Sequence, residues 1–445
     1  MKKILIPICL LIAAVAAVPF VNGMVAEKLA YQMADNVNQM YAQTGSDLRF
    51  SIDDYDRGML DSRIRWQIDF GSMASVYPVK NIVFTERATH GFFGVESQTD
   101  LLENPWFADW VENSQKGQNP LKITTRYPAF GPITSRITLT PFTVDTPKKT
   151  LNINAMEMTV SIEKDFSRMS YTGTWEGMSQ DEDNRLGSVT FDADLTRVTD
   201  VIWAGKGRAS LAQFKASENN APIDVSDVTM DFELTTADGK ENKANKTMDM
   251  EMGVRVGSVT MNKAVHKNWM LRVGIGAMDI KAYEALVTLY SRVVNEALAQ
   301  AAAPGFDADG ADRIMKNALT GSTPQLIAAL EKMLKKDFHI RIPELDITLP
   351  RGRITGNFHL GLKKDMTIAQ FLPLMMRPSH ALKIFTLKSD ASVPTAMLAG
   401  NPNLTVPILP GMATGLFVVD GASASHKAET RDGKLYINGS EVTLP

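Results

Sequence analysis

Residues 248–256 read Met-Asp-Met-Glu-Met-Gly-Val-Arg-Val, with a hydrophobic side chain at every second position. Successive side chains of a β-strand point to opposite faces of the sheet, so this stretch predicts a strand with one apolar and one polar face. Strands of parallel sheets are usually covered on both faces and read as continuous apolar runs. The stretch therefore predicts an antiparallel sheet.

The same alternation recurs from residue 48 to about residue 275. It is clearest at residues 64–70, 156–162, 189–195 and 228–234. Further strands are expected at residues 339–349, 354–362, 434–438 and 442–444. Together these stretches predict a long antiparallel meander.

A helical block near residues 278–336 interrupts the strands. Apolar side chains recur at helical spacing from Tyr283 to Ala301, and Pro304-Gly305 is expected to end that helix. A second helix is expected from Gly310 to Thr320, and a third from Thr323, which would be its N-cap. The predicted fold is α+β and mainly antiparallel β, with residues 45–445 as the body.

The N-terminus carries Lys2 and Lys3 before an apolar run from Ile4 to Val21. As a helix rising about 1.5 Å per residue, this run would be roughly as long as the hydrocarbon thickness of a bilayer. Residues 1–23 are therefore expected to be a signal anchor. A cleaved signal peptide is the alternative, because residues 14–16 read Ala-Val-Ala, a small-x-small pattern.

Residues 24–44 are expected to form an amphipathic stalk helix, with a stripe of Val25, Leu29, Met33, Val37 and Tyr41. The two lysines before the apolar run favour a cytoplasmic N-terminus. The sequence thus predicts a single-pass inner-membrane protein with a periplasmic body.

Composition excludes several classes of function. The chain has 445 residues and a net charge of −3, so it offers no electrostatic basis for a nucleic-acid partner. Its one cysteine, Cys9, lies in the apolar run, which leaves the body without disulfides or thiolate sites. Its 24 methionines include many on the apolar phase of strands. These predict either a methionine-rich core or an adaptable apolar binding surface.

Motifs for catalysis and metal binding are absent from the sequence. There is no Gly-x-Ser-x-Gly, and the histidines show no His-Glu-x-x-His pattern: they are His90, His266, His339, His359, His380 and His426. Asp307, Asp309 and Asp312 fail the calcium-loop pattern, because the sixth position is Asp312 itself and the twelfth is Ala318. They are interpreted as helix-start residues. No catalytic, cofactor-binding or metal residue is predicted, and the protein is not expected to be an enzyme.

Two local clusters stand out. Tyr55-Asp-Arg-Gly-Met-Leu-Asp-Ser-Arg63 is expected to join two strands, with Gly58 in the turn. Thr89-His-Gly-Phe-Phe93 is expected to be a turn at a strand end, with a recognition loop as the alternative. Neither cluster holds the partners that catalysis requires.

These clusters, the N-terminal apolar run, the helical block and the terminal segment Gly433–Gly439 occur in an order that resembles the YdgA-like bacterial proteins. That family is defined by a domain of unknown function. The resemblance implies a membrane-anchored envelope protein of Gram-negative bacteria and supplies no catalytic residues.

The expected function follows from these points. The sequence predicts a membrane-anchored periplasmic protein without catalytic activity, which binds lipid or another amphiphile in an apolar groove of a long antiparallel sheet. The expected partners are the inner membrane through residues 4–21, lipid and other envelope proteins, with no cofactor. The alternative is a structural or protein-interaction component of the envelope with a closed core.

Overall fold

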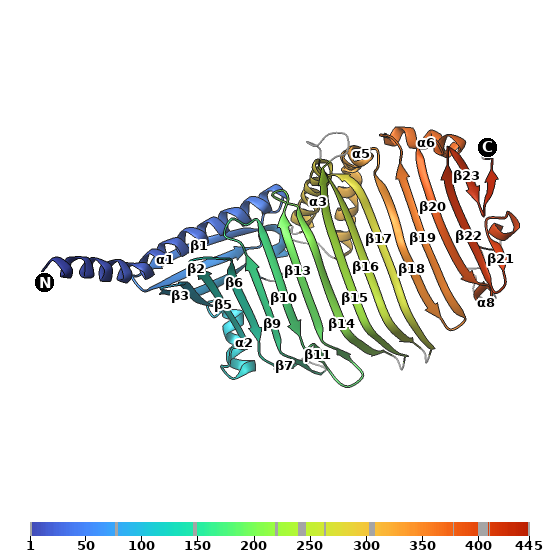
Figure 1. The fold of residues 1–445 in the computed structure, drawn as a ribbon. Coiled ribbons are helices and arrows are strands. Elements are labelled where there is room, and N and C mark those ends of the chain that lie inside the picture. Colours follow the sequence, from blue (N-terminus) through green and yellow to red (C-terminus); the bar gives the residue numbers. More distant parts are fainter. Residues whose placement is uncertain are drawn as a thin grey trace. The chain divides into compact units, whose positions relative to one another are not determined.

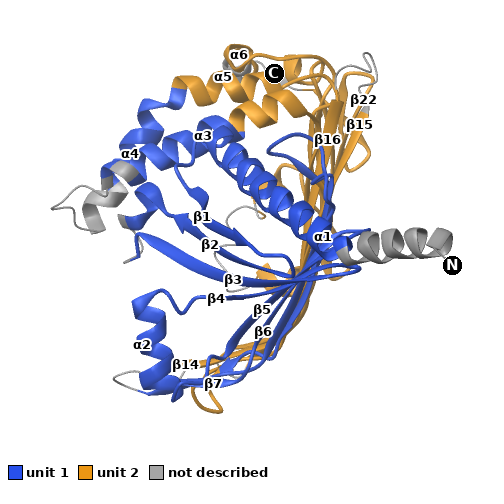
Figure 2. Ribbon diagram, turned by 90° about the vertical axis from the view of Figure 1, so that its left-hand side faces the viewer, with its two compact units in different colours: residues 1–178, 192–203, 287–323 blue, residues 179–191, 204–286, 324–445 orange. Residues whose placement is uncertain are grey.

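The structure is a computed structural model that describes residues 2–75, 79–145, 149–218, 221–238, 246–261, 264–301, 308–376, 378–398, 408 and 410–443. Side chains are not described for residues 2–16, which include Cys9, nor for Asp309 and Asp312. Pro304, Gly305 and Asp307 lie outside the described residues. The chain divides into two compact units, coloured separately in Figure 2.

Unit 1 comprises residues 1–178, 192–203 and 287–323. Its elements are α1 (Lys2–Gln43), β1 (Arg49–Arg57), β2 (Asp61–Asp69), a 3-10 helix (Gly71–Ser75), β3 (Asn81–Gly91), β4 (Gly94–Asp100), α2 (Pro105–Gln115), β5 (Leu121–Pro128), β6 (Ile133–Leu139), β7 (Phe142–Asp145), β8 (Thr150–Ile153), β9 (Met156–Ile162), β10 (Arg168–Trp175), most of β13 (Val189–Arg197), most of α3 (Ile280–Ala301) and α4 (Ala308–Gly321).

The strands of unit 1 form a sheet in the order β1, β2, β3, β4, β5, β6, β9, β10, β13. The pairs from β1 to β10 are antiparallel. Residues that face each other across an antiparallel pair share one side of the sheet, so the register assigns each side chain to a face. One face carries Ile64, Ala88 and Val95 and is buried, while the other carries mostly charged and hydroxyl side chains.

Two helices cover the buried face of this sheet. Helix α1 packs through Ala26 against Ala88 and Val95, with Tyr127 alongside. Helix α2 packs through Phe107 and Val111, with Leu101 just before it, against apolar side chains of β3 and β5: Ile82, Phe84, Leu121 and Ile123.

Helix α1 also closes one edge of the sheet. The Nδ2 of Asn38 donates to the carbonyl of Phe50 at 2.7 Å, and the Phe50 N–H donates to Oδ1 of Asn38 at 2.8 Å. Both bonds satisfy backbone groups of the edge strand β1, which would otherwise be open to pairing with another chain.

Unit 2 comprises residues 179–191, 204–286 and 324–445. Its elements are β12 (Arg185–Leu186), β14 (Trp203–Glu218), β15 (Ala221–Asp238), β16 (Lys246–Met261), β17 (Ala264–Asp279), the first residues of α3, α5 (Thr323–Met333), β18 (His339–Leu349), β19 (Gly352–Leu362), α6 (Ile368–Met376), α7 (Pro378–Ala381), β20 (Phe385–Pro394), α8 (Thr395–Leu398), β21 (Val418–Asp420), β22 (Ser423–Arg431), β23 (Lys434–Ile437) and β24 (Ser440–Val442). The short strand β11 (Met178–Ser179) lies at the boundary between the units.

The sheet of unit 2 is an antiparallel meander. From β14 to β20, each strand pairs with the strand that follows it in the chain, as the ribbon in Figure 1 shows. Strand β22 pairs with β20, β21 and β23, and β23 pairs with β24. A small core at this end contains Val393, Leu398, Ile408 and Ala424.

The predicted secondary structure is largely confirmed. Residues 156–162 and 339–349 form β9 and β18 at the expected bounds, and the opening stretch 248–256 lies within β16. The helical block is present as α3, α4 and α5. Helix α2 was not predicted, and residues 368–376, expected only as an apolar segment, form α6.

The N-terminal helix exists, but its predicted role in the membrane is not supported. In the part of the chain that the structure describes, no helix is sufficiently long and apolar to span a bilayer. This finding contradicts the predicted placement as a single-pass inner-membrane protein with a cytoplasmic N-terminus and a periplasmic body. Of the predicted stripe, Leu29 is buried and Met33, Val37 and Tyr41 are half-buried, but Val25 is exposed, and Ala26 and Ala34 are buried in addition.

Candidate functional site

The structure brings together the two clusters that the sequence presented separately. Tyr55–Arg63 forms the end of β1, a turn and the start of β2, whereas Thr89–Phe93 ends β3 and turns into β4. The Oγ of Ser62 lies 2.8 Å from Nε2 of His90, and both side chains are buried. The N–H of His90 donates to the carbonyl of Leu60 at 2.7 Å.

Glu86 and Tyr127 belong to the same buried region. The hydroxyl of Tyr127 donates to Oε1 of Glu86 at 3.3 Å. Burial raises the pKa of the Glu86 carboxyl, although hydrogen bonds from its neighbours oppose that shift. Burial also raises the pKa of Tyr127 well above its ordinary value, and that of Tyr55 to about 12. Tyr55 and Tyr127 are therefore neutral at neutral pH, and burial favours the protonated form of the Glu86 carboxyl.

Helix α1 covers this polar cluster. Its Glu27 forms an ion pair with Arg57 at 2.7 Å, and the guanidinium of Arg57 also lies 4.8 Å from the ring centre of Phe20. Asn22 donates to the carbonyl of Gly91 at 2.7 Å. The cluster thus connects α1 to β1, β2 and β3.

A serine and a histidine in contact are the elements of a nucleophilic site. Ser62 is 2% exposed and His90 is 4% exposed, so no substrate can reach either side chain in this conformation. The Nδ1 of His90 faces the carbonyl of Met59 at 3.4 Å, a long contact that orients the ring. The arrangement is suited to holding α1 on the sheet.

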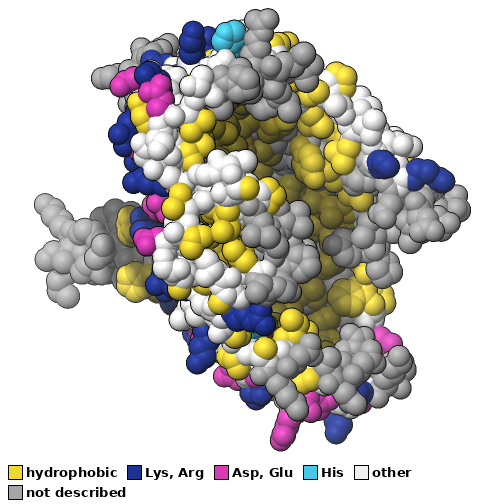
Figure 3. Space-filling view, turned by 90° about the vertical axis from the view of Figure 1, so that its right-hand side faces the viewer, with side chains coloured by type: hydrophobic (Ala, Val, Ile, Leu, Met, Phe, Trp, Pro, Cys, Tyr) yellow, Lys and Arg dark blue, Asp and Glu magenta, His cyan; other side chains and the backbone are white. Residues whose placement is uncertain are grey.

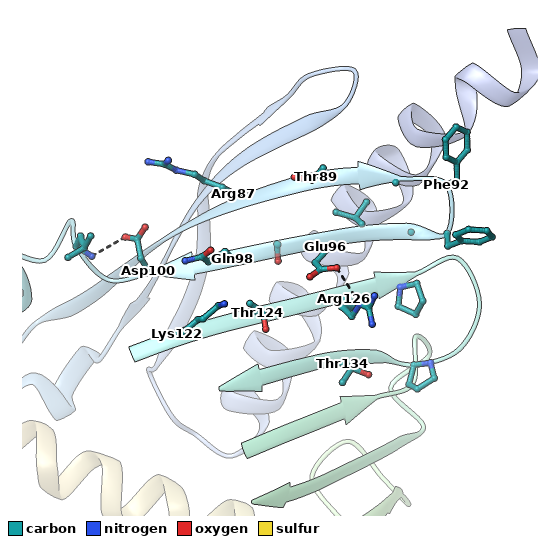
Figure 4. Close-up of a pocket in the computed structure, with 18 residues that line it drawn as sticks. Arg87, Thr89, Phe92, Glu96, Gln98, Asp100, Lys122, Thr124, Arg126 and Thr134 are labelled. Atoms are coloured by element: carbon teal, nitrogen blue, oxygen red, sulfur yellow. Dashed lines mark hydrogen bonds and ion pairs between the residues drawn. The ribbon is translucent and has the colours of Figure 1, made fainter. Parts of the chain in front are cut away.

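A second candidate is a hollow of about 1290 Å³ on the polar face of β3, β4, β5 and β6. Polar side chains from the four strands project into it, as Figure 4 shows: Arg87, Thr89, Glu96, Gln98, Asp100, Lys122, Thr124, Arg126 and Thr134. Phe92 and Phe93, in the turn between β3 and β4, line one end. The hollow combines hydrogen-bond donors, cations and aromatic rings.

A third candidate lies on the sheet of unit 2, where the alternating residues of four neighbouring strands share an apolar face. We call its exposed part the apolar strip: Met230, Met252, Leu271, Val273 and Ile340. Met252 of β16 stands opposite Val273 of β17. Val254 of β16 stands opposite Met230 of β15 on one side and Leu271 of β17 on the other. Ile275 of β17 stands opposite Ile340 of β18, so all these side chains share one face. Each member of the strip is between 39% and 48% exposed. In the view from the side of the C-terminal strands, hydrophobic side chains gather within a hollow (Figure 3).

The opposite face of the same strands carries a ladder of ion pairs. Arg272 contacts Asp231 at 2.8 Å and Glu251 at 3.1 Å, and Arg341 contacts Glu251 at 2.8 Å. Glycines make room for these side chains, since a β-carbon at Gly253 would lie 2.8 Å from Oδ1 of Asp231. The hydrogen bond with Asp231 is the main reason that the pKa of Arg272 is raised. The ladder ties the polar side of the sheet together.

Two of the histidines named from the sequence lie close together on neighbouring strands. His339 and His359 are half-buried strand residues, with ring centres 5.2 Å apart. Burial is the main cause of the lowered pKa of His359, and the charge of the neighbouring His339 lowers it further. Within the described ranges, no three carboxylate, histidine or cysteine side chains are grouped so that they could hold a metal ion.

Comparisons with known proteins support the family resemblance. The family described as "Bacterial protein of unknown function (DUF945)" matches residues 1–445. The chain is 21% identical to "Protein YdgA" of Escherichia coli (strain K12) over 404 residues, which cover 83% of this chain and 77% of that protein. No solved structure matches it significantly. The chain therefore belongs to the DUF945 family of bacterial proteins of unknown function.

Proposed function

We propose that this protein binds the apolar part of a lipid or another amphiphile on the apolar strip of unit 2, without chemical conversion of the ligand. The observation that carries the proposal is the exposure of the strip. Five large hydrophobic side chains on four neighbouring strands lie on one face, each between 39% and 48% exposed. Contiguous apolar surface of this kind marks binding sites in soluble proteins.

The side chains of the strip suit a hydrocarbon ligand. Met230 and Met252 are unbranched and can adjust to chains of different shape. Neighbouring strands lie about 4.8 Å apart, so the strip offers apolar contacts at close, regular intervals across the sheet. Ion pairs join the same strands on the opposite face, so the two faces of this sheet differ sharply in polarity.

The absence of catalysis is part of the proposal. Binding of an apolar chain requires burial of its surface and no nucleophile, acid or base. The strip itself presents only methionine, leucine, valine and isoleucine. The serine and histidine in contact, Ser62 and His90, lie in the other unit and are buried.

A protein-interaction role in the cell envelope is the second candidate. It is favoured by Phe130 and Met59, which lie in turns of unit 1 and are 93% and 73% exposed. Exposed aromatic side chains are typical anchors of protein interfaces.

Titration of a polarity-sensitive fluorescent fatty acid, kept below its critical micelle concentration, tests the amphiphile proposal on the full chain. Val273→Lys places a charge in the strip and is expected to weaken binding by about tenfold or more, equivalent to about 1.4 kcal/mol. Val419→Lys, at an exposed valine of β21, is the matched control and should leave binding unchanged.

Either of two results contradicts the proposal: no binding by the unmodified chain, or equal loss in both variants. Val273→Thr guards against misfolding, because it keeps the shape of the side chain while adding a hydroxyl. It should weaken binding less than lysine does and leave the thermal transition near that of the unmodified protein.

A further inference from the structure

Arg63 of β2 and Arg87 of β3 stand directly opposite each other on the polar face of unit 1. Both are exposed. Like charges in directly opposed positions of an antiparallel pair destabilise the sheet. Among the described residues, neither arginine forms an ion pair. Asp56 of β1 faces Arg63 from the other side, whereas the residues opposed to Arg87 are Arg63 and Gln98, so no carboxylate stands directly opposite Arg87.

Other arginines on this face have acidic partners. Arg65 contacts Asp53 and Glu103, Arg126 contacts Glu96, Arg136 contacts Glu157 and Arg168 contacts Asp194. The ordinary solution for a cation on this sheet is therefore a carboxylate on a neighbouring strand or loop. Arg87 departs from it, because its neighbours across the two strand pairs are Arg63 and Gln98, and an anionic ligand would supply the missing charge.

The register places further donors in line with this pair. Arg87 faces Gln98, and Gln98 faces Thr124 on the next strand. A row of four donor side chains therefore runs across β2, β3, β4 and β5, with about 4.8 Å between successive strands. Such a row fits an extended ligand that bears oxygen atoms along its length.

The charge of the hollow also favours an anion. Of the carboxylates that line it, Glu96 is paired with Arg126 at 3.5 Å, and Asp100 accepts bonds from the Thr85 hydroxyl at 2.8 Å and from the Leu102 N–H at 3.1 Å. Three cations, Arg87, Lys122 and Arg126, line the hollow against these two carboxylates.

The aromatic rings distinguish a saccharide from a simple polyanion. Phe92 and Phe93 line one end of the hollow and are 54% and 90% exposed. Aromatic faces stack on the C–H faces of sugar rings, whereas an inorganic polyanion gains nothing from them. Thr89, Thr124 and Thr134 add neutral hydroxyl groups that can bond to sugar hydroxyls (Figure 4).

We propose that the polar face of β2 to β5 is a binding site for an acidic saccharide. The anionic groups of the saccharide lie over Arg63 and Arg87, its hydroxyls bond to Gln98 and Thr124, and its ring faces stack on Phe92 or Phe93. This site is separate in sequence and in unit from the apolar strip, so it does not depend on the proposed amphiphile function.

Calorimetric titration of the full chain with a sulfated hexasaccharide derived from heparin tests the proposal. Replacement of both arginines, Arg63→Gln with Arg87→Gln, is expected to weaken binding by at least about tenfold. The control replaces two exposed arginines of unit 2, Arg208→Gln with Arg255→Gln, and should leave binding unchanged. Both double variants change the net charge of the protein by the same amount. If both lost the same binding affinity, long-range electrostatics would explain the loss and the proposal would be overturned.

Two further ligands separate the possible sources of binding. Maltohexaose, which is neutral, should bind weakly, and tripolyphosphate should bind less tightly than the sulfated hexasaccharide. The double variant Phe92→Ser with Phe93→Ser should bind the hexasaccharide severalfold more weakly, while its affinity for tripolyphosphate should not change. If tripolyphosphate binds as tightly as the hexasaccharide and the phenylalanine variant binds both as before, the site is a general polyanion site and the saccharide assignment fails.

Stability gives a second readout. Since Arg87 opposes Arg63 and faces no carboxylate, Arg87→Gln alone should leave the thermal transition equal to or above that of the unmodified protein at low salt. Loss of binding together with a lowered transition would show a structural role for Arg87 and contradict the proposal.

Discussion

Gly23 of helix α1 lies against the imidazole of His90: a β-carbon built on Gly23 would stand 2.3 Å from Cε1 of that ring. A glycine in a helix is otherwise less favourable than alanine by about 1 kcal/mol. Its place in α1 is explained by the close approach of the helix to the strand, which lets His90 remain buried and bonded to Ser62.

Gly23→Ala is therefore expected to lower the free energy of unfolding of unit 1 by about 1 to 3 kcal/mol, because the ring must move or the helix must lift. Urea unfolding followed by tryptophan fluorescence measures it. Gly321→Ala, at the end of α4 where nothing lies within 4 Å, is the control and should be neutral or slightly stabilising. Equal behaviour of the two variants would show that the helix does not pack on His90 in solution.

Glu86 should make stability depend on pH. Burial raises its pKa in the folded protein above the ordinary value of 4.5, so folding favours the protonated carboxyl. That contribution is fully present below the unfolded-state pKa and is lost as the pH rises through the folded-state pKa. Urea unfolding from pH 4.5 upward should show Glu86→Gln gaining stability relative to the unmodified protein.

The control for this titration is Glu182→Gln, at an exposed turn residue. Its free energy of unfolding should run parallel to that of the unmodified protein over the same pH range. A Glu86→Gln curve that also runs parallel would mean that the carboxyl is hydrated in the folded state.

Glu251 is the shared partner of two arginines in the ladder of unit 2. Glu251→Gln leaves Arg272 and Arg341 without this carboxylate, and their side chains are only 27% and 37% exposed. We expect a loss of about 1 to 2 kcal/mol in the free energy of unfolding. Glu441→Gln, which breaks the more exposed pair with Lys434, should cost less than about 1 kcal/mol. The same cost in both variants would remove the distinction between the ladder and an ordinary surface pair.

Phe107 anchors α2 on the sheet of unit 1. It is 6% exposed, so Phe107→Ala is expected to cost about 3 to 5 kcal/mol through lost burial and the cavity left behind. Trp106→Ala removes the neighbouring ring, which is 47% exposed, and should cost much less. Thermal unfolding of the two variants is the measurement, and a reversed order would contradict the packing of α2.

Much of the sheet could be predicted because its evidence is local. In β9 and β16, hydrophobic and polar residues alternate within a single strand, and no distant residue is needed to read them. Helix α2 was missed because only Phe107 and Val111 are buried along it, which leaves little periodicity. The apolar run from Ile4 to Val21 predicted a membrane span from hydropathy alone, and the structure does not support that span.

The candidate sites could not be predicted because they depend on register. Ser62 and His90 are far apart in the sequence, and only the pairing of β2 with β3 brings them into contact. Arg63 and Arg87 became neighbours through the same pairing. The sequence reveals residue types at each position, but the alignment of one strand with the next is set by turns and packing that a single chain does not display.

The meander of unit 2 has a consequence for how such a protein can vary. Each strand from β14 to β20 is bonded to its chain neighbours, so its surroundings are supplied by adjacent sequence. Insertion or deletion of one hairpin would lengthen or shorten the sheet by two strands and leave both faces continuous. Relatives could therefore differ in the extent of this sheet through changes in chain length alone, with no new fold.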